Sequence, residues 1–355
     1  MRNQLALITG VNGHLGSTLA RLLAKEGFSV RGLLRAGSRR EAIEGIPLEV
    51  FIGDVRDRAS IGRALQGVEA LFHLAAPPVV RTAEDRLAIT EGTRNVFELV
   101  RETPSVKKAV YISSSVTVGL TRTPQAVLNE QTSQRLTGTA YQEAKWDAET
   151  WLKEFLHAHP LPVVIANPST IVGPGNFSPT PPSRLILDFL NYAGTLDWLR
   201  EFNLKAAPVY FDSGFSVVDV EDVARGILLA YRKGRVGERY LLGGDNVTLY
   251  EFYRTLSGIT GLPAPWLYIP RPVMYALSYM LTCLMAHPPM SYRLAKTMVG
   301  HYAFFSSEKA ARELGYSPRP SQAALERAVE WFCRSPLVRE SRKKVLLRLA
   351  PGSQP

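Results

Sequence analysis

The 355-residue chain is poor in cysteine and has no long uninterrupted hydrophobic run. Its two cysteines, Cys283 and Cys333, are too far apart for a C-x-x-C site or a disulfide framework, which favours a reducing compartment. The nearly apolar stretch Val273–Ala286 is shorter than the roughly 18 residues of a membrane span. The apolar run near the N-terminus is too short for the core of a signal peptide. These absences predict a cytoplasmic protein.

Patterns for metal or nucleic-acid binding are also missing. The six histidines show no ligand spacing, and there is no zinc-type Cys/His set or basic-aromatic strand motif. We therefore expect no metal site and no nucleic-acid partner, and interpret His73, inside an apolar run, as a buried core histidine. The net charge of +10 needs another explanation. Half of it lies in residues 334–355, which we expect to form a weakly ordered basic tail.

Two segments raise the alternative of a weak, peripheral contact with a membrane. Val273–Ala286 is apolar, and Arg342–Arg348 is rich in cations. Together they could rest on an anionic lipid surface.

The first half of the chain alternates short apolar runs with stretches of helical periodicity. Such alternation is typical of βαβ units in a parallel sheet with helices on both faces. We predict an α/β, Rossmann-type doubly wound parallel sheet with a smaller, mostly helical C-terminal substrate domain. The expected strands are residues 5–9, 29–34, 48–52, 70–74, 109–113 and 163–167, and the expected helices are residues 15–25, 59–65 and 84–100.

The pattern changes after Asn167. Residues 168–182 are rich in Pro, Gly and Ser and are expected to leave the sheet as a loop. The sheet pattern then returns at 215–242, and the chain is helical from about residue 248 to 332. We assign residues 1–168 and 215–245 to a Rossmann domain, residues 169–214 and 246–333 to a substrate-binding cap, and residues 334–355 to the tail.

A glycine-rich turn links the first expected strand to the first expected helix. Gly10 permits the tight turn, Gly13 lets backbone N–H groups approach a pyrophosphate, and Gly16 lets the helix pack on the strand. The positive helix N-terminus also favours phosphate. This context predicts a dinucleotide-binding turn. Its cofactor-binding residues are Gly10, Asn12, Gly13, His14, Leu15 and Gly16.

The residues after the second expected strand bear on the choice of dinucleotide. An NAD site places a carboxylate about 20 residues after the turn, but here Arg35 stands at that position, followed by Arg39 and Arg40. Guanidinium groups suit a 2′-phosphate, so NADP(H) is favoured over NAD(H), with a solvated basic loop as the alternative. Asp54, next to Val55, ends the third strand and could accept from an adenine amine or belong to a turn.

Tyr141 and Lys145 form a Y-x-x-x-K pair on one face of an expected helix. A tyrosine with a pKa near 10 is a poor acid or base at neutral pH, and a neighbouring ammonium lowers that pKa. The run Ser113–Ser115 ends the preceding strand and offers a hydroxyl to a substrate oxygen. A second copy of the motif, Tyr292 and Lys296, has no such strand before it, so we interpret it as structural.

In this order, the glycine turn, the serine run and Tyr141-x-x-x-Lys145 resemble an extended short-chain dehydrogenase/reductase, that is, the NAD(P)-dependent epimerase/dehydratase family. Within that family, the chain is similar to the dihydroflavonol-reductase-like group, which also includes hopanoid-associated sugar epimerases. The resemblance covers roughly residues 3–333. Further matching stretches are Leu74–Ala76, Glu91–Asn95, Asn167–Pro174, Val218–Val223 and Phe304–Ser307.

The resemblance implies roles for the matching positions. Tyr141 would be the catalytic acid/base, Lys145 would lower its pKa and hold the nicotinamide ribose, and Ser114, five residues before Gly119, would complete the catalytic set. The further cofactor-lining residues that the family implies are Leu74, Ala75, Ala76, Ser113, Asn167 and Ser169.

Two positions depart from the family pattern. Ala144 stands where a Ser or Thr usually precedes the lysine, and Ile89 stands where Asn is frequent. The second change removes an expected polar contact behind the active site. The resemblance also implies a homodimer, formed through residues 84–100 and 141–157.

Three functions fit these features. The first is an NADPH-dependent reductase of a ketone or aldehyde on a fairly apolar metabolite, favoured by Arg35 and by the apolar region Ile269–Met290, whose alternative role is packing. The second is an NAD-retaining nucleotide-sugar epimerase or dehydratase. The third is a non-enzymatic dinucleotide sensor, which would need no Tyr/Lys pair. Four cations are available for the diphosphate of a nucleotide sugar: Arg184, Arg200, Arg271 and Arg293.

Overall fold

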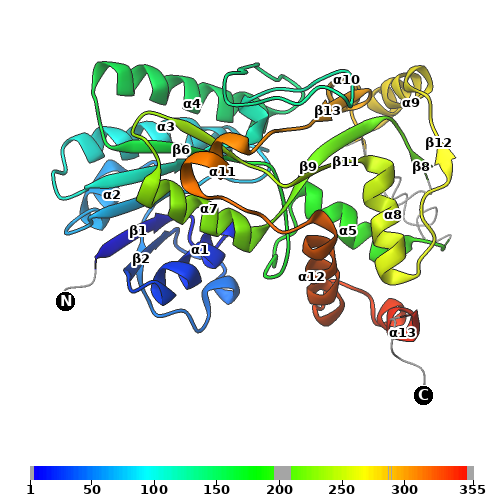
Figure 1. Ribbon diagram of the computed structural model, residues 1–355, viewed down its shortest axis with the longest axis horizontal. Helices are drawn as coiled ribbons and strands as arrows, with labels where there is room; N and C mark the ends of the chain where they lie inside the picture. The colour runs from blue at the N-terminus through cyan, green and yellow to red at the C-terminus, as the bar shows by residue number, and fades with distance from the viewer. Residues whose placement is uncertain (1–3, 196–208, 287, 289, 350–355) are drawn as a thin grey trace.

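Seven parallel strands form the central sheet of the computed structural model (Figure 1). The structure describes residues 4–195, 209–286, 288 and 290–349. The strand order is β10-β6-β5-β4-β1-β2-β3, so the order reverses at β1, where α/β sheets bind their ligands. The strands are β1 (Leu5–Thr9), β2 (Ser29–Leu34), β3 (Leu48–Ile52), β4 (Ala70–His73), β5 (Lys108–Ile112), β6 (Val163–Pro168) and β10 (Arg239–Leu242).

Successive strand residues face opposite sides of the sheet, and both sides are apolar. Ala6 and Ile8 of β1 belong to one core, whereas Leu7 between them belongs to the other. This double burial explains why the strands read as continuous apolar runs. One side is covered by α1 (His14–Lys25), α7 (Val220–Lys233) and α11 (Glu308–Leu314), and the other by α2 (Arg58–Ala64), α3 (Ala83–Arg101) and α4 (Ala140–Ala158).

A second part of the chain packs beside the sheet, on the right in Figure 1. Its centre is β9 (Ser213–Asp219), which pairs with β7 (Thr170–Val172), β11 (Asp245–Thr248) and β13 (His301–Ala303). A two-stranded sheet joins β8 (Val209–Tyr210) to β12 (Leu267–Tyr268). The helices of this part are α5 (Pro181–Tyr192), α8 (Leu249–Thr260), α9 (Arg271–Leu284), α10 (Tyr292–Met298), α12 (Ser321–Arg334) and α13 (Glu340–Leu349).

The Rossmann-type fold class is confirmed, and the first three predicted strands coincide with β1, β2 and β3. Two later predictions were wrong. The strand predicted at 215–219 does not rejoin the central sheet, because β9 belongs to the second sheet, and the predicted loop 168–182 contains β7. Both errors have one cause: β7 and β9 pair with each other in parallel. Pairing between such distant segments leaves no local pattern in the sequence.

The C-terminal segment is better ordered than the sequence suggested. Residue Val338, only 1% exposed, lies in the apolar core of the second part together with Leu346. Arg339 donates a 3.0 Å hydrogen bond to the Tyr192 hydroxyl of α5. Helix α13 is therefore docked through a few apolar and hydrogen-bonding side chains, although half of its residues are charged. The remainder of the predicted tail, residues 350–355, lies outside the described residues.

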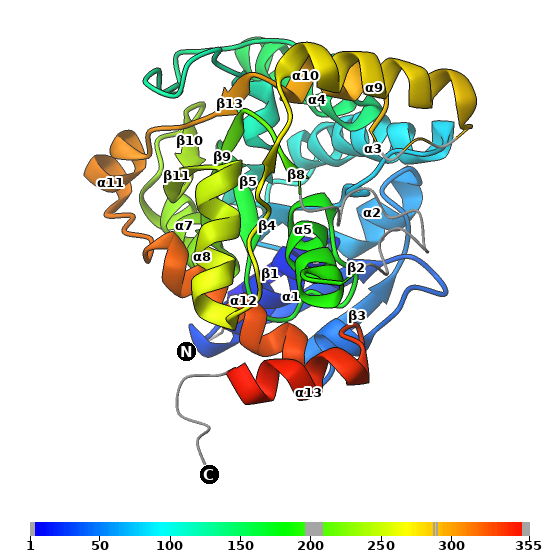
Figure 2. The same ribbon diagram turned by 90° about the vertical axis from the view of Figure 1, so that its right-hand side faces the viewer.

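Helices α9 and α13 lie at opposite edges of the molecule in both views (Figures 1 and 2). The joint membrane contact expected for Val273–Ala286 and Arg342–Arg348 stays a prediction. No helix of the described part of the chain is long and apolar enough to cross a bilayer.

Candidate active site

A continuous cavity of about 1310 Å³ follows the carboxyl ends of the central strands. It brings together residues from the turns after β1, β2, β3, β4, β5 and β6, which is where open α/β sheets bind ligands. Every predicted catalytic and cofactor-binding residue except Asn167 lines it: Gly10, Asn12, Gly13, His14, Leu15, Gly16, Arg35, Arg39, Asp54, Val55, Leu74, Ala75, Ala76, Ser113, Ser114, Tyr141, Lys145 and Ser169.

The glycine turn after β1 leaves no room for side chains. Gly10 has a positive φ of 73°, and a Cβ at Gly16 would lie 2.2 Å from the Gly10 carbonyl oxygen. Gly13 is the N-cap of α1, no side chain caps this helix, and its first turn carries no acidic residue. The first N–H groups of α1 are therefore available to an anion. This cradle fits the pyrophosphate of a dinucleotide.

Two arginines line the cavity beyond β2. The side chains of Arg35 and Arg39 are exposed, and Asn12 donates a 3.1 Å hydrogen bond to the Arg39 carbonyl, which ties this loop to the glycine turn. Asp54 also lines the cavity, but Arg56 binds its carboxylate at 2.7 Å. That hydrogen bond holds the pKa of Asp54 below its ordinary value. Asp54 is thus an anion whose oxygens are already engaged.

Helix α4 presents Tyr141 and Lys145 to the cavity from its first two turns. A capping box between Thr139 and Gln142 defines where the helix begins. The Lys145 ammonium is buried and donates a 2.9 Å hydrogen bond to the carbonyl oxygen of Ile112, the last residue of β5. This contact joins the helix to the strand that leads into the serine run.

Burial dominates the ionisation of both side chains. It raises the pKa of Tyr141 above its ordinary value, against the opposite effect of a hydrogen bond with Ser114. It also lowers the pKa of Lys145 to about 8, against the raising effect of the Glu149 charge. Lys145 is not among the causes of the Tyr141 pKa shift, and its ammonium is bonded to the Ile112 carbonyl. At neutral pH Tyr141 holds its proton and can donate it.

A buried carboxylate that the sequence analysis missed lies behind this pair. Glu149 is one helical turn beyond Lys145 and accepts hydrogen bonds from Ser113 at 2.5 Å and from Thr117 at 2.7 Å. Arg239 and Lys153 bind its other oxygen at 3.0 and 2.6 Å. Burial acts to raise the pKa of Glu149, but Lys153 and these hydrogen bonds hold it at about 2. The spacing Tyr-x-x-x-Lys-x-x-x-Glu was the available signal.

Asn167 belongs to this network and does not line the cavity, and its predicted contact with the cofactor stays a prediction. It is fully buried and donates hydrogen bonds to Glu149 at 2.8 Å and to the Ser114 carbonyl at 3.1 Å. Residues Val163 and Ile165, which precede it at two-residue intervals on β6, face the core beneath α4. Strand alternation therefore turns Asn167 away from the cavity and toward that helix.

The two departures from the family pattern are in contact. Ile89 and Ala144 are buried in one small apolar cluster with Ala148, and Tyr141 packs against it. A polar side chain at either position would face an apolar neighbour. The paired changes thus replace polar support behind Tyr141 by an apolar contact between α3 and α4.

His14 connects the glycine turn to the loop after β7. Its Nε2 lies 2.9 Å from the Pro174 carbonyl oxygen. Burial lowers its pKa to about 4, so the ring is neutral at pH 7. The sequence analysis also missed the cavity wall formed by Trp331, Pro336 and Leu337. Only folding of the C-terminal segment onto α5 brings these residues to the site.

The second Y-x-x-x-K copy is a packing motif, as predicted. In α10, the Lys296 ammonium lies 5.1 Å from the ring centre of Tyr292, and that ring makes edge contacts with Tyr275 and Tyr279. The cavity is lined instead by Leu294 and Met298.

His73 is a core histidine, as predicted. Its ring nitrogens lie 2.7 Å from Thr9 Oγ1 and 3.2 Å from Thr93 Oγ1. The Thr9 hydroxyl also accepts from the backbone N–H groups of Leu74 and Ala75, which fixes one wall of the cavity. Among the described residues, no group of three or more His, Cys, Asp or Glu is placed to hold a metal ion.

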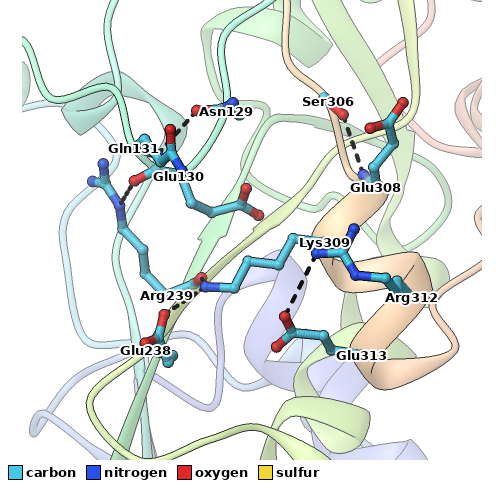
Figure 3. Close-up of a pocket in the computed structure, with 10 residues that line it drawn as sticks. All are labelled: Asn129, Glu130, Gln131, Glu238, Arg239, Ser306, Glu308, Lys309, Arg312 and Glu313. Carbon is cyan, nitrogen blue, oxygen red and sulfur yellow. Dashed lines mark hydrogen bonds and ion pairs between the residues drawn. The ribbon is translucent and has the colours of Figure 1, made fainter.

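A second pocket of about 420 Å³ lies between residues 129–131, β10 and α11 (Figure 3). Its charged side chains are largely paired with one another: Lys309 donates to Glu238 at 2.7 Å and to the Arg239 carbonyl at 2.8 Å. Arg239 separates this pocket from Glu149. The residues that line this pocket therefore hold Arg239, whose guanidinium pairs with Glu149 behind Tyr141 and Lys145.

Residues 6–243 match the model of the NAD-dependent epimerase/dehydratase family, and the chain belongs to this family. It is 33% identical to a putative dihydroflavonol 4-reductase from Synechocystis sp., over 92% of this chain and 93% of that protein. It is 34% identical to the sterol demethylase protein B of Methylococcus capsulatus, over 92% and 97%. The solved structure of gox2253 has a TM-score of 0.82 and 32% identity, over 95% of this chain and 100% of the other. The chain is thus an NAD(P)-dependent oxidoreductase of the extended short-chain type.

Proposed function

We propose that the protein reduces a ketone or aldehyde on a fairly apolar metabolite, with NADPH as the reductant and Tyr141 as the proton donor. The observation that carries this proposal is the position of Tyr141, Ser114 and Lys145 in one cavity with the glycine turn and two exposed arginines, Arg35 and Arg39. Tyr141 keeps its proton at neutral pH, because burial raises its pKa. A protonated tyrosine suits the reductive direction.

Each residue of the set has a distinct task. When bound, NADPH would supply the hydride that reduces the carbonyl carbon. Tyr141 would give its phenolic proton to the carbonyl oxygen, which becomes the alcohol, and the Ser114 hydroxyl would hydrogen-bond that oxygen. The Lys145 ammonium would hold ribose hydroxyls and stabilise the tyrosinate left behind.

The wall composition supports an apolar substrate. Phe177, Leu294, Met298, Trp331 and Leu337 line the cavity. The name of the Methylococcus relative points to sterol chemistry, which has the same character.

A sugar epimerase that retains NAD is the weaker candidate. Of the cations expected to bind a sugar diphosphate, Arg184, Arg271 and Arg293 do not line the cavity, and Arg200 lies outside the described residues. Mass spectrometry of small molecules released from the purified protein separates the two candidates. Tightly bound NAD without net NADPH consumption would favour the epimerase. The proposed homodimer through α3 and α4 stays a prediction.

Steady-state oxidation of NADPH with a panel of apolar ketones and aldehydes tests the proposal. We expect Tyr141→Phe to lower kcat by about 10²–10⁴-fold, and the control Tyr292→Phe to leave it unchanged. Full activity of Tyr141→Phe would falsify the assigned proton donor.

Cofactor preference has its own test. Arg35→Ser with Arg39→Ser should raise the KM for NADPH about 10–100-fold, the range expected for lost charge-assisted hydrogen bonds. The KM for NADH should be unaffected. Arg40→Ser is the matched control, because Arg40 does not line the cavity. Equal loss with both cofactors would contradict a 2′-phosphate role.

A further inference from the structure

The outer side of α9 is an exposed apolar surface. Val273, Tyr279, Met280 and Leu284 are 54, 59, 48 and 74% exposed, and Trp266, just before β12, is 73% exposed. We call these five residues the α9 face. In Figure 2, α9 runs along the upper edge of the molecule and its C-terminal end projects beyond the neighbouring helices. So many exposed large apolar side chains on one short segment are unusual on a protein surface that faces only water.

The opposite side of α9 is apolar as well. Met274 and Ser278 are buried there, and Met274 packs with Ala295 and Val299 of α10. A helix that is apolar on both sides is expected to bury its outer side against another apolar surface. With a rise of about 1.5 Å per residue, α9 is too short to span a bilayer, so the cover must lie along the helix.

The sequence segment that carries the α9 face has charges of one sign only. No Asp or Glu occurs between Glu251 and Glu308, a stretch that contains Arg271, Arg293 and Lys296. Arg293 pairs with Glu143 of α4. Asp212 accepts a hydrogen bond from Tyr268, whereas Arg271 and Lys296 are exposed. An apolar helix in a segment without acidic residues, with exposed tryptophan, tyrosine and basic side chains, has the composition of an interfacial membrane helix.

We propose that the α9 face docks on the surface of an anionic lipid bilayer. The helix would lie in the plane of the headgroups, with Met280 and Leu284 entering the acyl boundary and Trp266 and Tyr279 at headgroup level. Arg271 and Lys296 would meet lipid phosphates. The docking does not depend on the reductase activity proposed above.

The position of α10 relates this docking to the active-site cavity. Leu294 and Met298 line the large cavity, whereas Ala295 and Val299 of the same helix pack on α9. One helix therefore separates the α9 face from the cavity. An apolar substrate dissolved in the bilayer would have a short route to Tyr141.

Vesicle flotation with the full chain tests the docking. We expect the protein to float with phosphatidylcholine vesicles that contain about one third phosphatidylglycerol, and far less with phosphatidylcholine alone. The triple variant Val273→Glu, Met280→Glu, Leu284→Glu should lower the floating fraction at least about tenfold. A matched control adds the same charge elsewhere: Val50→Glu, Val127→Glu and Val236→Glu, all exposed valines. This control should float like the wild type.

Several outcomes would overturn the proposal. One is the absence of flotation with either vesicle, and another is equal flotation of the two triple variants. A third is a wild-type dimer that the α9 variant converts to a monomer without any lipid binding, which would assign the face to a second copy. Thermal unfolding and NADPH binding of the variants confirm folding, and the single change Leu284→Glu repeats the test at the most exposed position.

Discussion

The side-chain amide of Asn167 on β6 donates a 2.8 Å hydrogen bond to the Glu149 carboxylate on α4. This bond ties the sheet to the helix that carries Tyr141 and Lys145. Both partners are almost completely buried, and Arg239 enters the same network from the far side. In such a low-dielectric surrounding, each member depends on the charge of the others.

Replacement of Glu149 by Gln should therefore destabilise the fold strongly. The change leaves the buried Arg239 without its counter-ion, a loss that costs about 3–5 kcal/mol. Urea unfolding of Glu149→Gln measures it. Lys153→Met is the control: Lys153 also pairs with Glu149, but its side chain is 39% exposed, so we expect about 1 kcal/mol or less. Equal losses of unfolding free energy in the two variants would contradict the inference that the Glu149 charge stabilises the buried network.

The glycine turn allows a second matched comparison. A Cβ at Gly16 would lie 2.2 Å from the Gly10 carbonyl oxygen, whereas a Cβ at Gly62 in α2 meets nothing within 4 Å. We expect Gly16→Ala to cost about 1–3 kcal/mol and to abolish dinucleotide binding, and Gly62→Ala to stabilise the protein by about 0.5–1 kcal/mol. Thermal unfolding and cofactor titration check both. Normal cofactor affinity in Gly16→Ala would show that the turn can relax.

The lowered pKa of Lys145 predicts that activity declines at alkaline pH. Burial lowers its pKa from 10.5 to about 8, so reductive kcat/KM should fall by up to about tenfold per pH unit above pH 8, as the ammonium loses its charge. The free energy of unfolding changes in the opposite direction. Because Lys145 binds its proton more tightly in the unfolded chain, its contribution to the unfolding free energy rises from about pH 8 to 10.5. Lys145→Arg keeps its charge and should lack both effects. A wild-type profile that stays flat well above pH 8 contradicts the assignment.

The C-terminal segment should be needed for the intact site. Deletion of residues 336–355 removes Pro336 and Leu337 from the cavity wall and the buried Val338 from the core. We expect a loss of several degrees in Tm and weaker binding of cofactor or substrate. Deletion of residues 350–355 is the control and should change neither. Unchanged binding after the longer deletion would show that the segment only covers the site.

The cofactor half of the site could be predicted from the sequence because its signals are local. Gly10, Gly13 and Gly16 are constrained by one turn, and Tyr141 and Lys145 by one helical repeat. Neither pattern depends on how distant segments of the chain pair or pack.

What the sequence did not indicate is side-chain direction and long-range pairing. Asn167 was assigned to the cavity by its place in a motif, but the alternation along β6 turns it under α4. Strands β7 and β13 are three residues long, and each pairs with β9, a partner far away in the sequence. The charge of the C-terminal segment suggested weak order, yet Val338 and Leu346 pack in the core and Arg339 bonds to Tyr192.

With Ile89 and Ala144 packed behind Tyr141, the side of the tyrosine ring that faces α3 is apolar. A proton given up in reduction is then replaced from the cavity side, by water that enters after the product has left. An apolar substrate that fills the cavity shuts this water out for as long as it stays. In the reduction proposed above, Tyr141 would thus regain its proton between turnovers and not during them.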